Sequence, residues 1–190
     1  LADNTAIPAD VATDLISQAE HDDAAAAVLV TDSEQLISDV QEELKKLSSQ
    51  TAHSDRVQKA LGGQQSALVL VDDLDAAINF ANGYAAEHLE LMTAENQSVL
   101  GKIVHAGAIF VGDYSPVSLG DYMAGSNHVL PTGGSARFNA GLSVATFLRP
   151  QQVIEYSRSA LEVLAAQIDT FAKAEGLPAH GDAVTARFSS

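Results

Sequence analysis

Apolar residues occur along the chain in short continuous runs that alternate with longer segments of periodic apolar positions. Ala25–Thr31, Ala67–Val71 and Ala108–Val111 are the short runs, typical of strands buried on both faces. Apolar residues that return every three or four positions predict helices over about 8–21 and 75–85, and a further long helix from Leu36 to Leu47. This alternation predicts an α/β fold with a parallel, Rossmann-like sheet flanked by helices.

The last part of the chain shows only the helical period. After Pro150, apolar residues repeat at helical spacing at Leu161, Leu164, Ile168 and Phe171. Gly176 is placed to end this helix, because glycine readily adopts the left-handed conformation of a helix terminus. We therefore divide the chain into an α/β portion, residues 1–146, and a helical tail, residues 147–190.

The segment from Gly112 to Gly141 is expected to be a long loop. It holds six of the thirteen glycines and two of the five prolines. A loop of this length inside a compact domain is usually functional or disordered. It also carries Asp121, Tyr122 and His128, and these polar side chains favour a functional loop.

Composition excludes several classes of protein. The net charge is −15 without a basic patch, which argues against nucleic-acid binding. No apolar run approaches the ~20 residues of a membrane-spanning helix. With no cysteine, disulfides and thiolate metal sites are excluded, so any metal must be held by nitrogen and oxygen ligands. A cysteine-free chain without a secretory signal is expected in the cytoplasm.

Two short motifs in the first half of the chain could carry chemistry. Gln18 and His21 are three residues apart on a predicted helix, so they share a face and could hold one metal ion. The alternative is a surface glutamine and a helix-end histidine. Glu87 and His88 are adjacent and could act as a general acid–base pair at a turn. The alternative is an ordinary polar helix end.

Two further motifs lie later in the chain. Asp121 offers an oxygen ligand and His128 a nitrogen ligand, although a plain turn with a capping aspartate also fits. Glu175 ends the predicted last helix, and His180 follows a turn fixed by a glycine and a proline. A histidine that stabilises the helix terminus is the alternative there. Taken together, the motifs supply a nitrogen and oxygen ligand set suited to zinc: Gln18, His21, Asp121 and His180.

Five stretches of the chain, in order and spacing, resemble the histidinol dehydrogenase family. They are residues 14–21, 86–91, 106–112, 120–134 and 175–180. The fourth is the most specific, because it joins Gly-Asp-Tyr to Gly-Ser-Asn-His-Val-Leu-Pro-Thr-Gly-Gly. The similarity extends over essentially the whole chain.

The resemblance implies a reaction and a set of site residues. Members of the family oxidise L-histidinol through L-histidinaldehyde to L-histidine with zinc and two NAD, in the last steps of histidine biosynthesis. The implied zinc ligands are Gln18, His21, Asp121 and His180, and the implied acid–base pair is Glu87 and His88. The implied substrate contacts are Gln18, His21, His88, Asp121, His128, Glu175 and His180.

The resemblance also implies an assembly. Family members are intertwined homodimers whose tail completes the partner's site, so Glu175 and His180 would act in trans. Members are roughly twice as long as this chain, and the chain opens on Leu1, so we expect it to be cut from something longer. The absent N-terminal half should complete the sheet and carry most of the NAD-binding residues, which are unknown here.

Two other functions stay open at this stage. A zinc-dependent hydrolase would use the same ligands and the Glu–His pair to activate water. The second alternative is a non-catalytic metal-binding or dimerisation module, because half of an enzyme could retain only such a role. Turnover of an ester or amide without NAD would favour the first, and intact dimerisation without histidinol turnover would favour the second.

Overall fold

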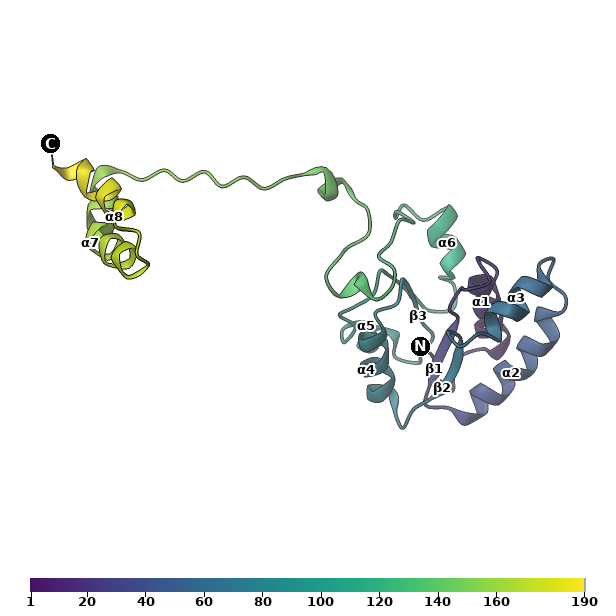
Figure 1. Ribbon diagram of the computed structural model, residues 1–190. Coiled ribbons are helices and arrows are strands. Elements are labelled where there is room, and N and C mark those ends of the chain that lie inside the picture. The colour runs from purple at the N-terminus through teal and green to yellow at the C-terminus, as the bar shows by residue number, and fades with distance from the viewer. Residues whose placement is uncertain (190) are drawn as a thin grey trace. The chain divides into compact units, whose positions relative to one another are not determined.

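The chain forms two compact units in a computed structural model that describes residues 1–189 (Figure 1). The first unit spans Leu1–Phe147, and the second begins at Leu148. Among residues 1–189, none of the helices combines the length and apolar character that crossing a membrane requires.

The first unit alternates helices with short strands. In chain order these are α1 (Pro8–Ala19), β1 (Val28–Thr31), α2 (Glu34–Ser48), α3 (Ser54–Leu61), β2 (Ala67–Leu70), α4 (Leu74–Tyr84), β3 (His88–Leu91), α5 (Asn96–Leu100), β4 (Ala108–Val111) and α6 (Val117–Tyr122). Two 3-10 turns follow, at Ser135–Arg137 and Val144–Phe147. The side chains of Ser33 and Asp73 accept backbone N–H bonds at the starts of α2 and α4, which satisfies donors left free in a first helical turn.

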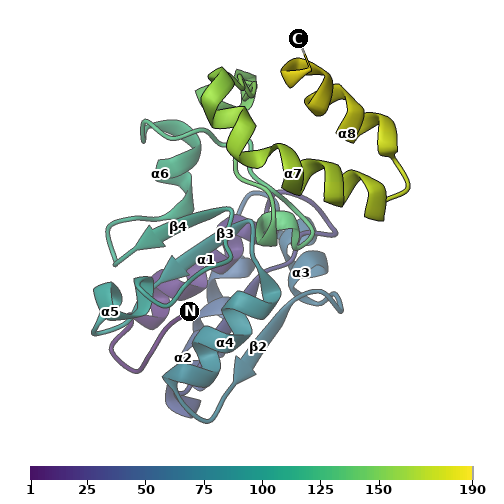
Figure 2. The ribbon, with the colours of Figure 1, turned by 90° about the vertical axis from the view of Figure 1, so that its left-hand side faces the viewer.

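The strands form two parallel pairs, β1 with β2 and β3 with β4. The first residues of the chain lie between the pairs, because Ala2 makes parallel bridges to both Thr31 and Met92. The order across the unit is therefore β2, β1, the segment Leu1–Asp3, β3 and β4. Figure 2 shows β3 and β4 side by side, and Figure 1 shows β1 beside β2. The predicted parallel α/β arrangement is confirmed.

Helices cover both faces of this arrangement. Leu29 packs in a cluster with Leu15 of α1 and Val40 of α2. Val30, the next residue of β1, packs in a second cluster with Ile78 of α4. Successive strand residues thus point to opposite helical layers, which explains why the strand sequences are continuously apolar.

Two elements differ from the sequence-based expectation. Glu87 and His88 were expected at a turn, but His88 begins β3, in which Leu89 and Leu91 are buried against the α4 layer and His88 and Glu90 face the other way. Polar and apolar residues alternate here, which is the period-two pattern of a strand buried on one face. The two polar residues drew attention to possible chemistry and not to a strand. The expected loop from Gly112 to Gly141 contains the helix α6.

The second unit consists of α7 (Arg158–Ala174), α8 (Pro178–Thr185) and a 3-10 turn at Ala186–Phe188. Gly176 has a φ of +74°, its N–H donates to the Lys173 carbonyl at 3.1 Å, and the Leu177 N–H donates to the Ala172 carbonyl at 2.8 Å. These bonds form a Schellman motif and confirm the predicted helix end.

Candidate active site

One large cavity in the first unit, of about 1230 Å³, brings together residues from distant parts of the chain. Six of the predicted site residues line it: Gln18, His21, Glu87, His88, Asp121 and His128. The other two belong to the second unit, where Glu175 caps the end of α7 and His180 lies inside α8. His180 follows the turn at Gly176, as expected, and lies in the first turn of α8.

The cavity residues gather at the amino ends of the strands. Gln18 and His21 lie at the end of α1, just before β1, and His88 is the first residue of β3. Open α/β sheets usually bind ligands at the carboxyl ends of their strands. The predicted site residues lie at the opposite end, because Gln18 and Asp121 come near the last residues of α1 and α6, the helices that return to that edge.

His88 is the most informative residue of the cavity. Its side chain is only 11% exposed, and both ring nitrogens are buried without a hydrogen-bond partner among the described residues. Nε2 lies 4.0 Å from Oδ1 of Asp121 on α6, too far for a direct hydrogen bond. Because an unpartnered buried polar group costs free energy, this imidazole is suited to bind a ligand.

The backbone around Glu87 and His88 is held by an unusual conformation on one side and by close packing on the other. Ala85, which ends α4, has a φ of 54°, an uncommon left-handed conformation for a residue other than glycine. A Cβ on Gly107 would lie 2.5 Å from the carbonyl oxygen of Glu87, and one on Gly120 would lie 2.6 Å from the ring of Phe110. Glycine at both positions therefore permits the close packing around the pair.

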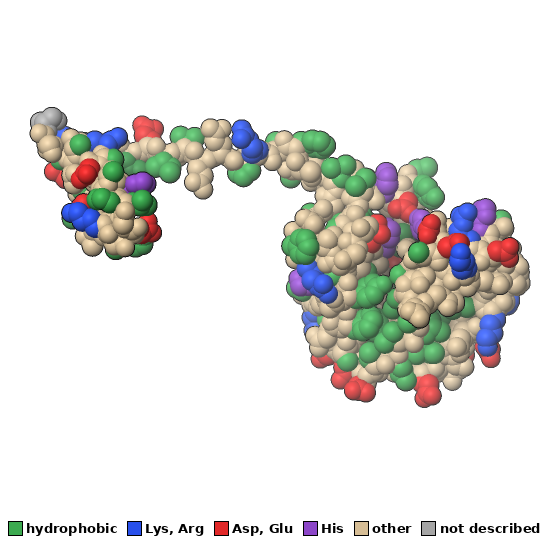
Figure 3. Space-filling model, in the orientation of Figure 1, with side chains coloured by type: hydrophobic (Ala, Val, Ile, Leu, Met, Phe, Trp, Pro, Cys, Tyr) green, Lys and Arg blue, Asp and Glu red, His purple; other side chains and the backbone are tan. Residues whose placement is uncertain are grey.

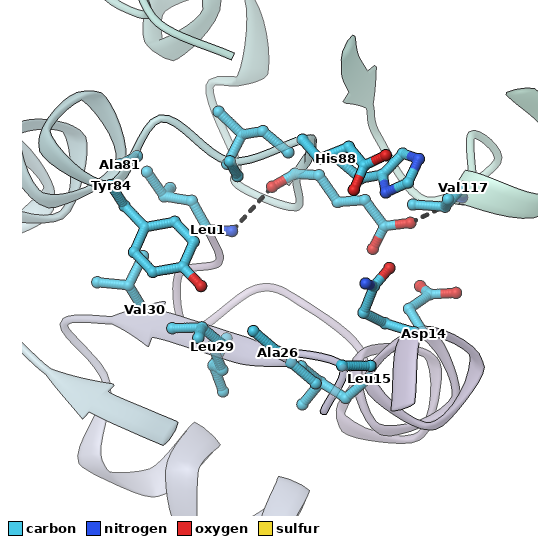
Figure 4. Close-up of a pocket in the computed structure, with 18 of the residues that line it drawn as sticks. Leu1, Asp14, Leu15, Ala26, Leu29, Val30, Ala81, Tyr84, His88 and Val117 are labelled. Atoms are coloured by element: carbon cyan, nitrogen blue, oxygen red, sulfur yellow. Dashed lines mark hydrogen bonds between the residues drawn. The ribbon is translucent and has the colours of Figure 1, made fainter. Parts of the chain in front are cut away.

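Two carboxylates that the motif analysis missed also line the cavity. Asp14 lies on α1, four residues before Gln18, and Glu90 lies on the same face of β3 as His88. Oε1 of Glu90 accepts a hydrogen bond from the Val117 N–H at 3.0 Å (Figure 4). Burial, reinforced by the charge of Asp14, raises the pKa of Glu90 to about 7, and burial likewise raises the pKa of Asp14. Asp14 is four residues before Gln18 on a helix, and Glu90 is two residues after His88 on a strand, so each shares a face with a predicted site residue. These spacings could have predicted both carboxylates from the sequence.

Comparison with known proteins identifies the family. The model of the histidinol dehydrogenase family matches residues 1–188. The chain belongs to the histidinol dehydrogenase family.

The curated relatives are close in sequence but much longer. Histidinol dehydrogenase of Leifsonia xyli subsp. xyli is 62% identical over 188 residues, which cover 99% of this chain and 43% of the relative. Histidinol dehydrogenase of Mycolicibacterium smegmatis is 59% identical, over 99% of this chain and 42% of the relative. The chain thus spans less than half the length of the family members that it matches.

A solved structure supports the fold. The crystal structure of histidinol dehydrogenase from Elizabethkingia anophelis matches with a TM-score of 0.91 and 35% identity, over 98% of this chain and 43% of that chain. The two units of this chain therefore correspond to part of a longer histidinol dehydrogenase fold.

The donor atoms of the cavity are of the types that bind a divalent cation such as zinc, but they are not arranged closely enough to surround one. Gln18 and Asp121 offer oxygen and His21 offers nitrogen at one cavity. Within residues 1–189 no three histidine, aspartate or glutamate side chains are clustered as a metal site. The first unit thus supplies three of the four implied ligands, and the fourth, His180, belongs to the second unit.

Proposed function

We propose that this chain provides the zinc-, substrate- and proton-handling residues of an L-histidinol dehydrogenase. The observation that carries the proposal is His88, whose two buried ring nitrogens lack partners in a cavity that also holds Gln18, His21 and Asp121. Membership of the family supports the choice of reaction.

The proposed reaction is a four-electron oxidation in two steps. L-histidinol loses a hydride to one NAD and its hydroxyl proton to a base, which gives L-histidinaldehyde. Water then adds to the aldehyde, and the hydrate loses a second hydride to another NAD and a proton, which gives L-histidine. The NAD-binding residues would lie in the part of the family's chains that this chain does not span. The proposed enzyme would work in histidine biosynthesis in the cytoplasm.

His88 and Glu87 have different roles in this proposal. His88 takes the hydroxyl proton in the first step, because neither of its ring nitrogens is committed to another residue. Glu87, the residue before it on the cavity wall, activates water for attack on the aldehyde. A positioned acid or base of this kind contributes roughly 10²–10⁴-fold to a rate.

The remaining site residues would hold the metal and the substrate. The proposed zinc ligands are Gln18, His21, Asp121 and His180. When bound, zinc would hold the substrate imidazole and amine and so orient the alcohol carbon. His128 and Glu175 would contact the substrate, and in a homodimer the partner subunit's Glu175 and the partner subunit's His180 would complete each site.

Calorimetric titration of the metal-stripped chain with zinc, with and without L-histidinol, tests the proposal. We expect one zinc site per chain that tightens when histidinol is present. Binding unaffected by histidinol would contradict the substrate assignment. Hydrolysis of an ester or amide by the zinc-loaded chain without NAD would assign a hydrolase instead. If the complete relative from Leifsonia binds zinc and this chain does not, the chain alone is a non-catalytic module.

A further inference from the structure

The side chain of Glu90 connects three elements of the first unit. Glu90 lies on β3, and its Oε1 accepts a hydrogen bond from the N–H of Val117, the first residue of α6, at 3.0 Å. Its carboxyl group is also hydrogen-bonded to the carboxyl group of Asp14 on α1. All three residues are partly buried, so water competes less for these bonds. We call Asp14, Glu90 and the Val117 N–H the carboxyl junction.

The carboxyl junction needs one proton. Ionised carboxylates only accept hydrogen bonds, so a bond between two carboxyl groups requires one of them to be protonated. Burial, reinforced by the charge of Asp14, raises the pKa of Glu90, which favours the protonated form. A protonated Glu90 can accept the Val117 N–H with one oxygen and donate to Asp14 with the other. A single side chain thus holds two helices to one strand.

Each of the three joined elements carries a residue of the proposed site. Gln18 follows the junction residue of α1 by one helical turn, and Asp121 follows that of α6 by one helical turn. His88 precedes the junction residue of β3 by two positions, on the same face of the strand. All three line the cavity, and Figure 3 shows acidic and histidine side chains together at this edge of the first unit. A shift of any element at the junction would therefore move a site residue.

The helix α6 depends on contacts with the sheet for its position. It has six residues, too few for a helix that is stable by itself. Besides the bond from Val117 to Glu90, Gly120 is buried against the ring of Phe110 on β4. The side chain of Tyr122, by contrast, is 80% exposed. The junction thus fixes the amino end of the short helix that carries Asp121.

We propose that Glu90 is a positioning residue of the site. Together with Asp14, it holds α1, β3 and α6 at the separation at which Gln18, His88 and Asp121 act on one ligand. The identity of that ligand rests on the proposed function, whereas the junction rests on the contacts above. Residues that orient metal ligands in this indirect way typically change metal affinity by roughly 10–100-fold when they are replaced.

Two substitutions of Glu90 separate the hydrogen bonds from the shape of the side chain. Glu90→Gln keeps both bonds, because its amide oxygen accepts the Val117 N–H and its amide N–H donates to Asp14. Glu90→Met keeps a similar length and removes both strong bonds. Val99→Ala is the control for a general loss of stability, since Val99 is buried in α5, beyond the carboxyl end of β3. Amide hydrogen exchange and calorimetric titration with zinc are measured on the three variants and the parent.

We expect the amides of Val117 and Asp121 to exchange at least ~10-fold faster in Glu90→Met than in Glu90→Gln. The Asp121 amide is the more informative of the two, because it does not itself bond to Glu90. In Val99→Ala both amides should exchange as in the parent, because a local opening of α6 does not involve α5. Zinc affinity should fall by about 10-fold in Glu90→Met and by less than ~2-fold in the other two variants.

Equal exchange at Asp121 in Glu90→Met and Glu90→Gln would overturn the proposal, because the two bonds would then not hold α6. Equal zinc affinity in these two variants would overturn it as well. If the parent itself binds no zinc, the proposed function fails, and the exchange at Asp121 alone decides whether Glu90 positions α6. The two failures are therefore distinguishable.

Discussion

Nε2 of His88 on β3 and Oδ1 of Asp121 on α6 face each other at 4.0 Å. The gap exceeds a hydrogen bond, and the imidazole has no other partner among the described residues, so both groups can contact a ligand that binds beside them in the cavity. Asp121 is also one of the proposed zinc ligands.

Asp121→Asn is expected to weaken zinc binding by at least ~10-fold, because it removes an anionic ligand from the cavity. The measurement is the calorimetric titration of the metal-stripped chain. Asp113→Asn is the matched control, since Asp113 is exposed in the connection before α6. Equal losses in the two variants would mean that overall charge, and not the cavity, sets the affinity.

Glu87→Gln is expected to slow the oxidation of L-histidinaldehyde more than that of L-histidinol, because only the aldehyde step needs water to be activated. A loss of roughly 10²-fold or more is expected in the second half-reaction. Both half-reactions would be followed by NADH formation in a preparation that combines the chain with the rest of a family member. Equal losses in the two steps would contradict the separate roles of Glu87 and His88.

Glu90→Gln is expected to change how stability depends on pH. Burial and Asp14 raise the pKa of Glu90 to about 7, against 4.5 for the unperturbed group. Between these values the unfolded chain releases a proton that the folded chain retains, so the stability contribution of Glu90 is present below pH 4.5 and is lost as pH rises through about 7. The amide can still accept the Val117 N–H and does not ionise.

The Glu90→Gln variant should therefore resemble the parent near pH 4.5 and exceed its stability at pH 8 by on the order of 1–3 kcal/mol. Denaturant unfolding across this range measures the difference. Glu42→Gln, at an exposed position of α2, should show no such trend. A stability difference that does not grow with pH would show that Glu90 ionises normally in the folded chain.

Gly107→Ala is expected to destabilise the first unit by about 1–3 kcal/mol, because the new Cβ would lie 2.5 Å from the backbone oxygen of Glu87. The same shift should disturb Glu87 and His88, and so weaken the effect of histidinol on zinc binding. Gly125→Ala is the control, since no atom lies within 4 Å of its added Cβ. Equal unfolding midpoints for the two variants would show that the Glu87 carbonyl moves aside freely.

The sequence by itself determined the local structure wherever burial repeats at a regular period. Continuous apolar runs predicted β1, β2 and β4, and the residues around Gly176 predicted the end of α7. The sequence did not predict the strand β3, because two of its four residues are polar and face a cavity. Its pattern therefore resembled a polar motif more than a buried strand.

Only the tertiary structure decided which polar residues meet. Gln18, His88 and Asp121 share a cavity because Leu1–Asp3 lies between β1 and β3, and this strand order is set by long-range pairing that no local period encodes. The pairing of Asp14 with Glu90 has the same origin. Helical and strand periods record which face of an element is buried, whereas the packing of whole elements against one another determines which buried faces lie together.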